Sequence, residues 1–188
     1  IIPIYRSDED FNLVSTYIEP IINSLKLKGI SVLFDKRDTY KPGYKFNEHE
    51  IKGVPIRLVV GPKDIENSTL EIFRRDKMEK EIIDLCDLES KVDYLLEDIQ
   101  KCLFEKAKNF TNLNTRKADN FLEFKDLINN KGGFVSAHWD GTKETEEKIK
   151  RETKATIRLI PMDGVKEKGN CIYSNKPSTH RVLFAKAY

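Results

Sequence analysis

The sequence has few residues of the kinds that cross-link a protein or anchor it in a membrane. Its 188 residues include only three cysteines, which are too few and too scattered for a disulfide framework. No apolar run approaches the roughly 18–20 residues of a membrane span, and we expect no signal peptide. We therefore expect a reducing, cytoplasmic environment and no association with a membrane.

An excess of charge of one sign is also missing. Lys and Arg number 33 against 31 Asp and Glu, which gives a net charge of +2. This balance excludes a histone-like polycation, so any nucleic-acid binding must come from a local patch of side chains. The length allows one large domain or two small ones. Because the chain begins at Ile1 without Met, inside what reads as a strand, we expect it to be part of a longer protein.

Catalytic motifs are missing as well. The three histidines are scattered, and the sequence contains no G-x-S-x-G motif, no Cys–His motif and no Gly-rich phosphate loop. The segment Tyr5-Arg6-Ser7, after the first apolar run, lacks the glycines of a cofactor loop, which argues against a flavodoxin-like enzyme. We expect no catalytic residue in this chain.

The sequence does contain an alternation of strand and helix patterns, which is typical of an α/β protein. Ser7 and Asp10 have the spacing of a capping box, and Gly29 is a natural end for the helix that they begin. Strands at 1–5 and 30–34 would form a parallel pair with a right-handed crossover. The other elements predicted up to residue 110 are a short helix at 44–52, strands at 55–61, 69–74 and 80–84, and a helix at about 88–110.

Residues 110–119 show no periodicity, and we place a domain boundary there, between domains at 1–110 and 111–188. The second domain is predicted to contain helices at 121–128 and 142–154, and strands at 134–139, 156–160 and 181–186. The expected fold is a mixed β-sheet flanked by helices, followed by a smaller α/β domain.

Residues 35–64 are the densest functional candidate. They contain seven Lys or Arg, five Asp or Glu, and the interleaved aromatic residues Tyr40, Tyr44 and Phe46. Acids repel a phosphate backbone, whereas a site that reads bases can use all three kinds of residue. Rings stack on unpaired bases, cations contact phosphate or guanine acceptors, and carboxylates accept from guanine N–H groups. An ordinary charged surface over core aromatics is the alternative.

Two spacings in this segment bear on where its side chains point. Phe46 and Glu50 are four residues apart, so both lie on one face of the predicted helix. Ile56, Leu58 and Val60 form an apolar row, and Arg57, which alternates with them, points away from that row. The residue types are those that guanine recognition needs.

Residues 35–64 carry the string D-x-R-D-x-Y-x-P-G-x-K-F-x-E-x-E-x-K-G-V-P-x-R-x-x-x-G-P-K-D, which resembles the anticodon-binding domain of prolyl-tRNA synthetases. It looks most like the archaeal/eukaryote-like branch, which also occurs in some bacteria. The later ETKATIRLIP (152–161) and the terminal VLFAKAY (182–188) resemble the extra C-terminal domain of that branch. The resemblance covers nearly the whole chain and implies the anticodon-binding fold of class II synthetases.

This resemblance implies that the chain reads the two anticodon guanines of proline tRNAs. Phe46 would stack on a base, and Glu50 and Asp64 would accept hydrogen bonds from guanine Watson–Crick edges. Arg57 and Lys63 would approach guanine acceptors or phosphate. These contacts are the usual mode for unpaired RNA bases.

The resemblance also implies a catalytic core outside these residues. With ATP and Mg, that core would make prolyl-adenylate and transfer proline to the tRNA, so this chain alone would be inactive. The full-length protein would be a homodimer through its core, and this piece a monomer.

Many members of this branch hold a structural zinc with four cysteines in a C-x₄-C … C-x₂-C spacing. Here the pattern falls on Asp140, Thr145, Cys171 and Ser174, of which only Cys171 could supply a thiolate. We expect the domain to keep its fold without the metal. His49 stands where the family usually has Trp, which predicts a weaker stacking or packing role at this position.

A free-standing paralogue of an anticodon-binding domain, serving as an RNA-binding accessory subunit, is the main alternative. The terminal VLFAKAY argues against it, because in the family that end lies near the catalytic core of a synthetase. A class II core encoded upstream of Ile1 would decide between the two.

Overall fold

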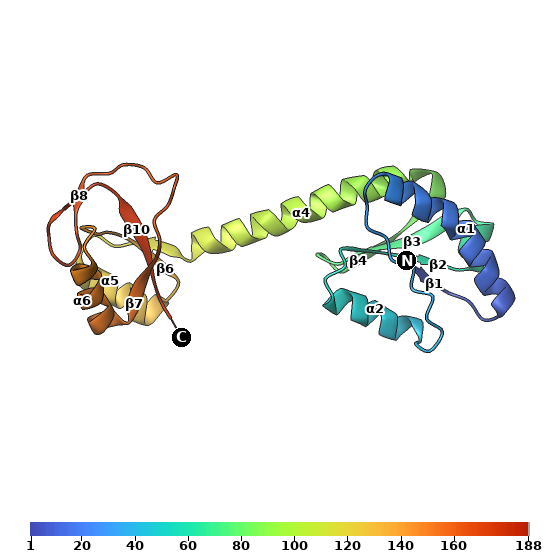
Figure 1. The fold of residues 1–188 in the computed structure, drawn as a ribbon, viewed down its shortest axis with the longest axis horizontal. Coiled ribbons are helices and arrows are strands. Elements are labelled where there is room, and N and C mark those ends of the chain that lie inside the picture. Colours follow the sequence, from blue (N-terminus) through green and yellow to red (C-terminus); the bar gives the residue numbers. More distant parts are fainter. Residues whose placement is uncertain (188) are drawn as a thin grey trace. The chain divides into compact units, whose positions relative to one another are not determined.

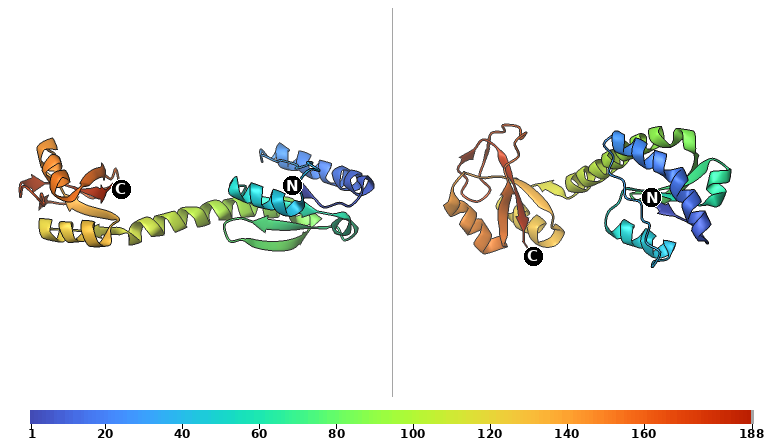
Figure 2. Two further views of the ribbon diagram at one scale, coloured as in Figure 1. Left: turned by 90° about the horizontal axis from the view of Figure 1, so that it is seen from below. Right: turned by 45° about the vertical axis from the view of Figure 1, so that its right-hand side comes forward.

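The computed structural model describes residues 1–187 (Figure 1). By their internal contacts these residues form two compact units, which divide between Glu105 and Lys106. The division falls inside helix α4 (Leu88–Leu113), which is one continuous helix in both views of Figure 2. The predicted boundary at 110/111 lies in the same helix. Each unit has its own sheet and its own hydrophobic core.

The first unit contains a four-stranded sheet in the order β1-β2-β3-β4. β1 pairs with β2 in parallel, whereas β2, β3 and β4 are antiparallel to one another in turn. The bounds are β1 Ile2–Pro3, β2 Ile56–Val60, α3 Pro62–Glu66, β3 Thr69–Arg74, β4 Glu79–Asp84 and a 3-10 turn at Leu85–Asp87. This mixed sheet flanked by helices confirms the predicted fold class.

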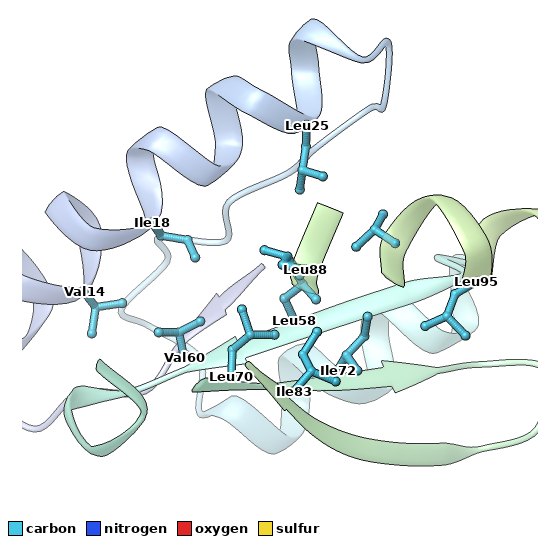
Figure 3. Packing of buried hydrophobic residues seen from close by; sticks show 11 residues of the cluster. Val14, Ile18, Leu25, Leu58, Val60, Leu70, Ile72, Ile83, Leu88 and Leu95 are labelled. Carbon is cyan, nitrogen blue, oxygen red and sulfur yellow. The ribbon is translucent and has the colours of Figure 1, made fainter. Parts of the chain in front are cut away.

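Helices α1 (Asp8–Leu27) and α4 cover one face of this sheet. The Ser7 hydroxyl accepts a hydrogen bond from the Asp10 amide (3.2 Å) at the start of α1, and the helix continues through Pro20. Figure 3 shows apolar side chains of both helices directed at those of the sheet. The buried cluster comprises Val14, Ile18, Leu25, Leu58, Val60, Leu70, Ile72, Ile83, Leu88, Val92 and Leu95. It fixes which side of β2 faces the core.

Helix α2 (Pro42–Ile51) packs on the opposite face of the sheet. Side chains alternate along a strand, so Arg57 of β2 points away from the core residue Leu58. On that side Arg57 contacts Phe46 and Glu50 of α2. Because Leu58 faces the core on one side of the sheet, its neighbour Arg57 faces α2 on the other side.

The strand predicted at 30–34 does not form. The predicted parallel pairing with residues 1–5 is also wrong, because the two segments form no regular ladder. The terminal nitrogen of Ile1 donates to the Leu33 carbonyl (2.7 Å), and the Ile1 carbonyl accepts from the Asp35 amide (2.9 Å). β1 is only two residues long, and its Pro3 has no N–H to extend the pairing. The alternating residues of the segment still pack against the core, which explains the pattern. The parallel partner of β1 is β2 instead.

The second unit is a four-stranded sheet in the order β5-β6-β10-β7 with helices α5 and α6 packed on it. β5 is parallel to β6, and β10 is antiparallel to both β6 and β7. The bounds are β5 Thr115–Lys117, α5 Phe121–Asp126, a π-helical turn Leu127–Lys131, β6 Phe134–His138, α6 Lys143–Thr153, β7 Ala155–Leu159, β8 Gly169–Asn170, β9 Pro177–Ser178 and β10 Arg181–Lys186. Phe124 of α5, Ile149 of α6 and Phe184 of β10 are fully buried in its core.

Three details of the second half differ from the sequence prediction. α4 extends to Leu113, and β5 occupies part of 110–119, where we expected no regular structure. α5 ends at Asp126 and continues as the π-helical turn.

Among residues 1–187, no helix is both long and apolar enough to cross a membrane.

Candidate nucleic-acid interface

Three of the five predicted site residues contact one another between α2 and β2. The Arg57 guanidinium lies between two rings, 4.0 Å from the centre of Phe46 and 4.1 Å from that of Phe73. Its Nη1 donates to Glu50 Oε1 at 2.6 Å. Phe46 and Glu50 therefore do share one face of α2, as their spacing predicted.

Arg57 is buried in this arrangement, whereas Glu50 is not. Arg57 is 9% exposed, and contact with ring faces and a carboxylate compensates for removing its charge from water. The Glu50 side chain is 24% exposed, and in the described residues only its Oε1 is engaged in a hydrogen bond. Oε2 can therefore accept from a ligand while Arg57 holds the carboxylate in place.

Lys63 and Asp64 lie on α3, directly after β2. Asp64 caps this short helix, because its Oδ2 accepts from the Gly61 amide at 2.8 Å. Lys63 is exposed beside it. In the described residues 1–187, no hydrogen bond, ion pair or cation–π contact joins this pair to Phe46, Glu50 and Arg57. The five predicted residues therefore form two groups.

Sequence reasoning missed a second polar cluster, centred on Asp35. His49 Nε2 lies 2.9 Å from Asp35 Oδ2, and the Lys45 ammonium donates to the Asp35 carbonyl at 3.1 Å. Arg37 donates from Nε and Nη2 to the two carboxylate oxygens at 2.8 and 2.7 Å. The Arg37 guanidinium, assisted by His49 and against the effect of burial, holds the pKa of the Asp35 carboxyl well below its usual range.

The structure gives His49 a polar packing role, which the sequence did not indicate. His49 is buried, and its ring is fixed by Asp35. The four-residue spacing of Lys45 and His49 could have placed both on one helix face. The partner, however, is an acid ten residues before Lys45 in an irregular segment, which no local periodicity reveals.

Two exposed tyrosines lie on the other flank of α2. The rings of Tyr40 and Tyr44 are stacked 4.5 Å apart, with an angle of 15° between their planes. The Arg37 guanidinium lies 5.0 Å from the Tyr40 ring centre. Tyr44 and Phe46 are two residues apart, so they point to nearly opposite sides of the helix. The aromatic residues of the segment are therefore divided between two surfaces.

Three of the four positions that correspond to the family's zinc ligands, Asp140, Thr145 and Ser174, form a hydrogen-bonded cluster with Thr142 in the second unit. The Asp140 carboxylate accepts from the hydroxyls of Thr142 (2.8 Å), Thr145 (2.8 Å) and Ser174 (2.6 Å), and from the Thr142 amide (3.1 Å). Burial raises the pKa of Asp140, but the hydrogen bonds, with that of Ser174 the strongest, lower it to about 2.

This donor set does not fit a structural zinc. Two of the four positions, Thr145 and Ser174, hold hydroxyls, and the Asp140 carboxylate already accepts from these two and from the Thr142 hydroxyl, whereas closed zinc sites use four N or S ligands. Within residues 1–187, no group of three or more His, Cys, Asp or Glu side chains is arranged to hold a metal ion. The cluster links the loop before α6 to the turn at 171–174 by hydrogen bonds alone.

Two family models match this chain. The model described as "Anticodon binding domain" matches residues 1–95, and the chain belongs to that family. The model described as "Prolyl-tRNA synthetase, C-terminal" matches residues 121–188. Together the two matches correspond to the C-terminal region of prolyl-tRNA synthetases.

Several relatives that match the whole chain are named proline--tRNA ligase. The chain is 50% identical over 188 residues to that of Flavobacterium johnsoniae, 52% to that of Porphyromonas gingivalis and 48% to that of Cytophaga hutchinsonii. These alignments cover all of this chain but 38% of each relative. The chain thus spans about two fifths of the length of the curated relatives it matches.

Proposed function

We propose that this chain recognises the anticodon of proline tRNA as part of a proline–tRNA ligase. The observation that carries the proposal is the pairing of Glu50 with Arg57 beside the Phe46 ring, on a domain of the anticodon-binding family. A stacking ring beside an oriented carboxylate is what recognition of an unpaired guanine requires.

Each residue of the candidate interface has a defined task in this proposal. Phe46 stacks on an anticodon base, and Glu50 accepts from guanine N1–H and N2–H₂ through its exposed oxygen. Arg57 orients both groups from its buried position, and a direct approach of Arg57 to RNA would require it to leave them. Lys63 contacts phosphate or a guanine acceptor, and Asp64 accepts from the second guanine.

The whole protein supplies the remaining parts of the proposed activity. A class II catalytic core of the same polypeptide uses ATP and Mg to activate proline and transfers it to the tRNA. The full-length enzyme is a cytoplasmic homodimer of the archaeal/eukaryote-like branch, and this chain alone is a monomer without ligase activity. We include the absence of a zinc ion from the second unit in the proposal, because the Asp140 cluster replaces the ligands.

The alternative of a free-standing RNA-binding accessory subunit has less support. Relatives named proline--tRNA ligase align with all of this chain, including the terminal VLFAKAY. That alignment favours a piece of the ligase.

The proposal predicts that this chain distinguishes anticodons. We would measure its affinity for an RNA hairpin with a proline anticodon, and for the same hairpin with both anticodon guanines replaced by adenine. Loss of two base contacts at about 1–3 kcal/mol each should weaken binding at least about tenfold. Equal affinity for the two hairpins would contradict anticodon reading.

A further inference from the structure

Helix α2, which carries the proposed base-reading residues Phe46 and Glu50, is attached to its domain in an unusual way. Amphipathic helices of soluble proteins generally bury an apolar stripe. The buried side chains of α2 are instead those of Lys45 and His49. Lys45 is only 2% exposed, which makes it one of the most deeply buried large side chains in the described residues.

Both buried side chains of α2 converge on one residue, Asp35. His49 contacts the carboxylate at 2.9 Å, and Lys45 contacts the main-chain carbonyl at 3.1 Å and the carboxylate at 3.8 Å. Asp35 is itself 4% exposed, and its amide is hydrogen-bonded to Ile1 at the edge of the sheet. Asp35 therefore links α2 to the edge of the sheet.

The order of residues along α2 connects the anchor, which is the contact of Lys45 and His49 with Asp35, to the readers, which are Phe46 and Glu50. Lys45 precedes Phe46 directly, and His49 precedes Glu50 directly, so anchor and reader residues alternate in two successive turns. Neighbouring residues point about 100° apart on a helix. A rotation of α2 about its axis that displaced Lys45 and His49 from Asp35 would therefore turn Phe46 and Glu50 away from Arg57 by the same angle.

We propose that Asp35 is a positioning residue for base recognition: by pairing with Lys45 and His49 it sets the rotation of α2 and hence the placement of Phe46 and Glu50. The inference rests on the proposed function. Asp35 touches no base and acts only through α2. Because removing one member of a buried charged group leaves its partners unpaired, the anchor is sensitive to loss of the Asp35 charge.

The same unit offers a matched control in a second buried carboxylate. Asp76 accepts from Arg74 Nε and Nη2 at 2.8 and 2.7 Å, as Asp35 does from Arg37. The Asp76 side chain is 4% exposed, against 2% for that of Asp35. Arg74 is also paired with Asp98 of α4 and not with α2. Loss of the Asp76 charge should destabilise the unit without moving the readers.

The test compares Asp35→Asn with Asp76→Asn in the complete 188-residue chain. For each protein we would measure the unfolding midpoint and the affinity for the two hairpins defined above. We expect both substitutions to lower the midpoint, but only Asp35→Asn to reduce the affinity ratio between the hairpins, by roughly threefold or more, because small misplacements of a site cost heavily. Lys45→Met, which keeps length and removes the charge, should reduce the ratio in the same direction.

Three outcomes are distinguishable. A wild-type chain that does not discriminate between the hairpins contradicts the proposed function. If the wild type discriminates while Asp35→Asn and Lys45→Met keep its ratio, the positioning role is overturned and Asp35 serves stability alone. The same holds if Asp76→Asn reduces the ratio as much as Asp35→Asn. If Asp35→Asn does not fold, Lys45→Met decides.

Discussion

Single charged side chains hold the candidate interface together. Asp35, Lys45 and Arg57 are all at least nine tenths buried, and each contacts an opposite charge or an aromatic ring. Such groups are costly to bury alone, and removing one partner typically costs about 3–5 kcal/mol because the other charge stays behind. Substitutions at these residues should therefore affect stability as well as binding, which is why each binding test needs a structural control.

Asp140 is the charged residue whose role can be tested most simply. Its pKa in the folded chain is about 2, below its unfolded value of 3.8. The carboxylate therefore contributes stability above about pH 4, and this contribution is lost as the pH falls through 2. We expect Asp140→Asn to lower the free energy of unfolding by about 1–3 kcal/mol at pH 7 and by less near pH 2.

Urea unfolding followed through Trp139, the only tryptophan, reports on this unit directly. The exposed Asp163 provides a control, and Asp163→Asn should change stability by less than about 0.5 kcal/mol. A chelator should leave the wild-type transition unchanged. Equal effects of the two substitutions, or unfolding by the chelator, would contradict a metal-free cluster built on Asp140.

The junction between helix α4 and strand β6 depends on one glycine. Gly133 has a φ of +78°, and a Cβ there would lie 2.4 Å from the Asn114 carbonyl oxygen. That carbonyl accepts from the Phe134 amide at 2.8 Å, so it cannot move without loss of a hydrogen bond. Gly141 has the same φ but open space around it.

We expect Gly141→Ala to cost about 1 kcal/mol for the left-handed backbone alone. Gly133→Ala should cost at least about 1 kcal/mol more, because overpacking is added to the same strain. Thermal and urea unfolding of both variants would measure the difference. Similar losses in the two would show that the contact with Asn114 is relaxed at little cost.

Elements with strong periodicity could be predicted from the sequence, and short or irregular ones could not. The Ser7 cap of α1 and the i, i+4 charge pairs of α6 are local signals, and the structure has both helices. The alternation of residues 30–34 led to the wrong prediction of a strand, because these residues pack against the core without pairing in a regular ladder. β5 and the hairpin of β8 and β9 are too short to carry a periodicity of their own.

Each of the two units has its own core, and each is matched by its own family model. The net charge of +2 gives no general attraction to RNA. Binding must therefore come from the placement of particular groups. The sequence identified the residue types at 46, 50 and 57, but it could not show that Phe73, from a different strand, completes the enclosure of Arg57. Long-range partners of this kind leave no local pattern.

Under the proposed function, Glu50 reads a base and does not merely lie near phosphate. Glu50→Gln keeps the shape and can still accept from Arg57, but it replaces the carboxylate oxygen that Arg57 does not use with an amide donor that faces guanine N–H groups. Glu48→Gln is the matched control on the same helix, where Glu48 pairs with Arg37 and Lys52 at 2.5 and 2.7 Å.

The decisive measurement is the affinity of wild type, Glu50→Gln and Glu48→Gln for the two hairpins, at low and at moderate salt. We predict that Glu50→Gln weakens binding to the proline anticodon by about 1–3 kcal/mol at both salt concentrations and has little effect on the guanine-free hairpin. Glu48→Gln should keep the wild-type ratio. If Glu50→Gln instead binds both hairpins more tightly, most clearly at low salt, the segment follows phosphate and Glu50 does not read guanine.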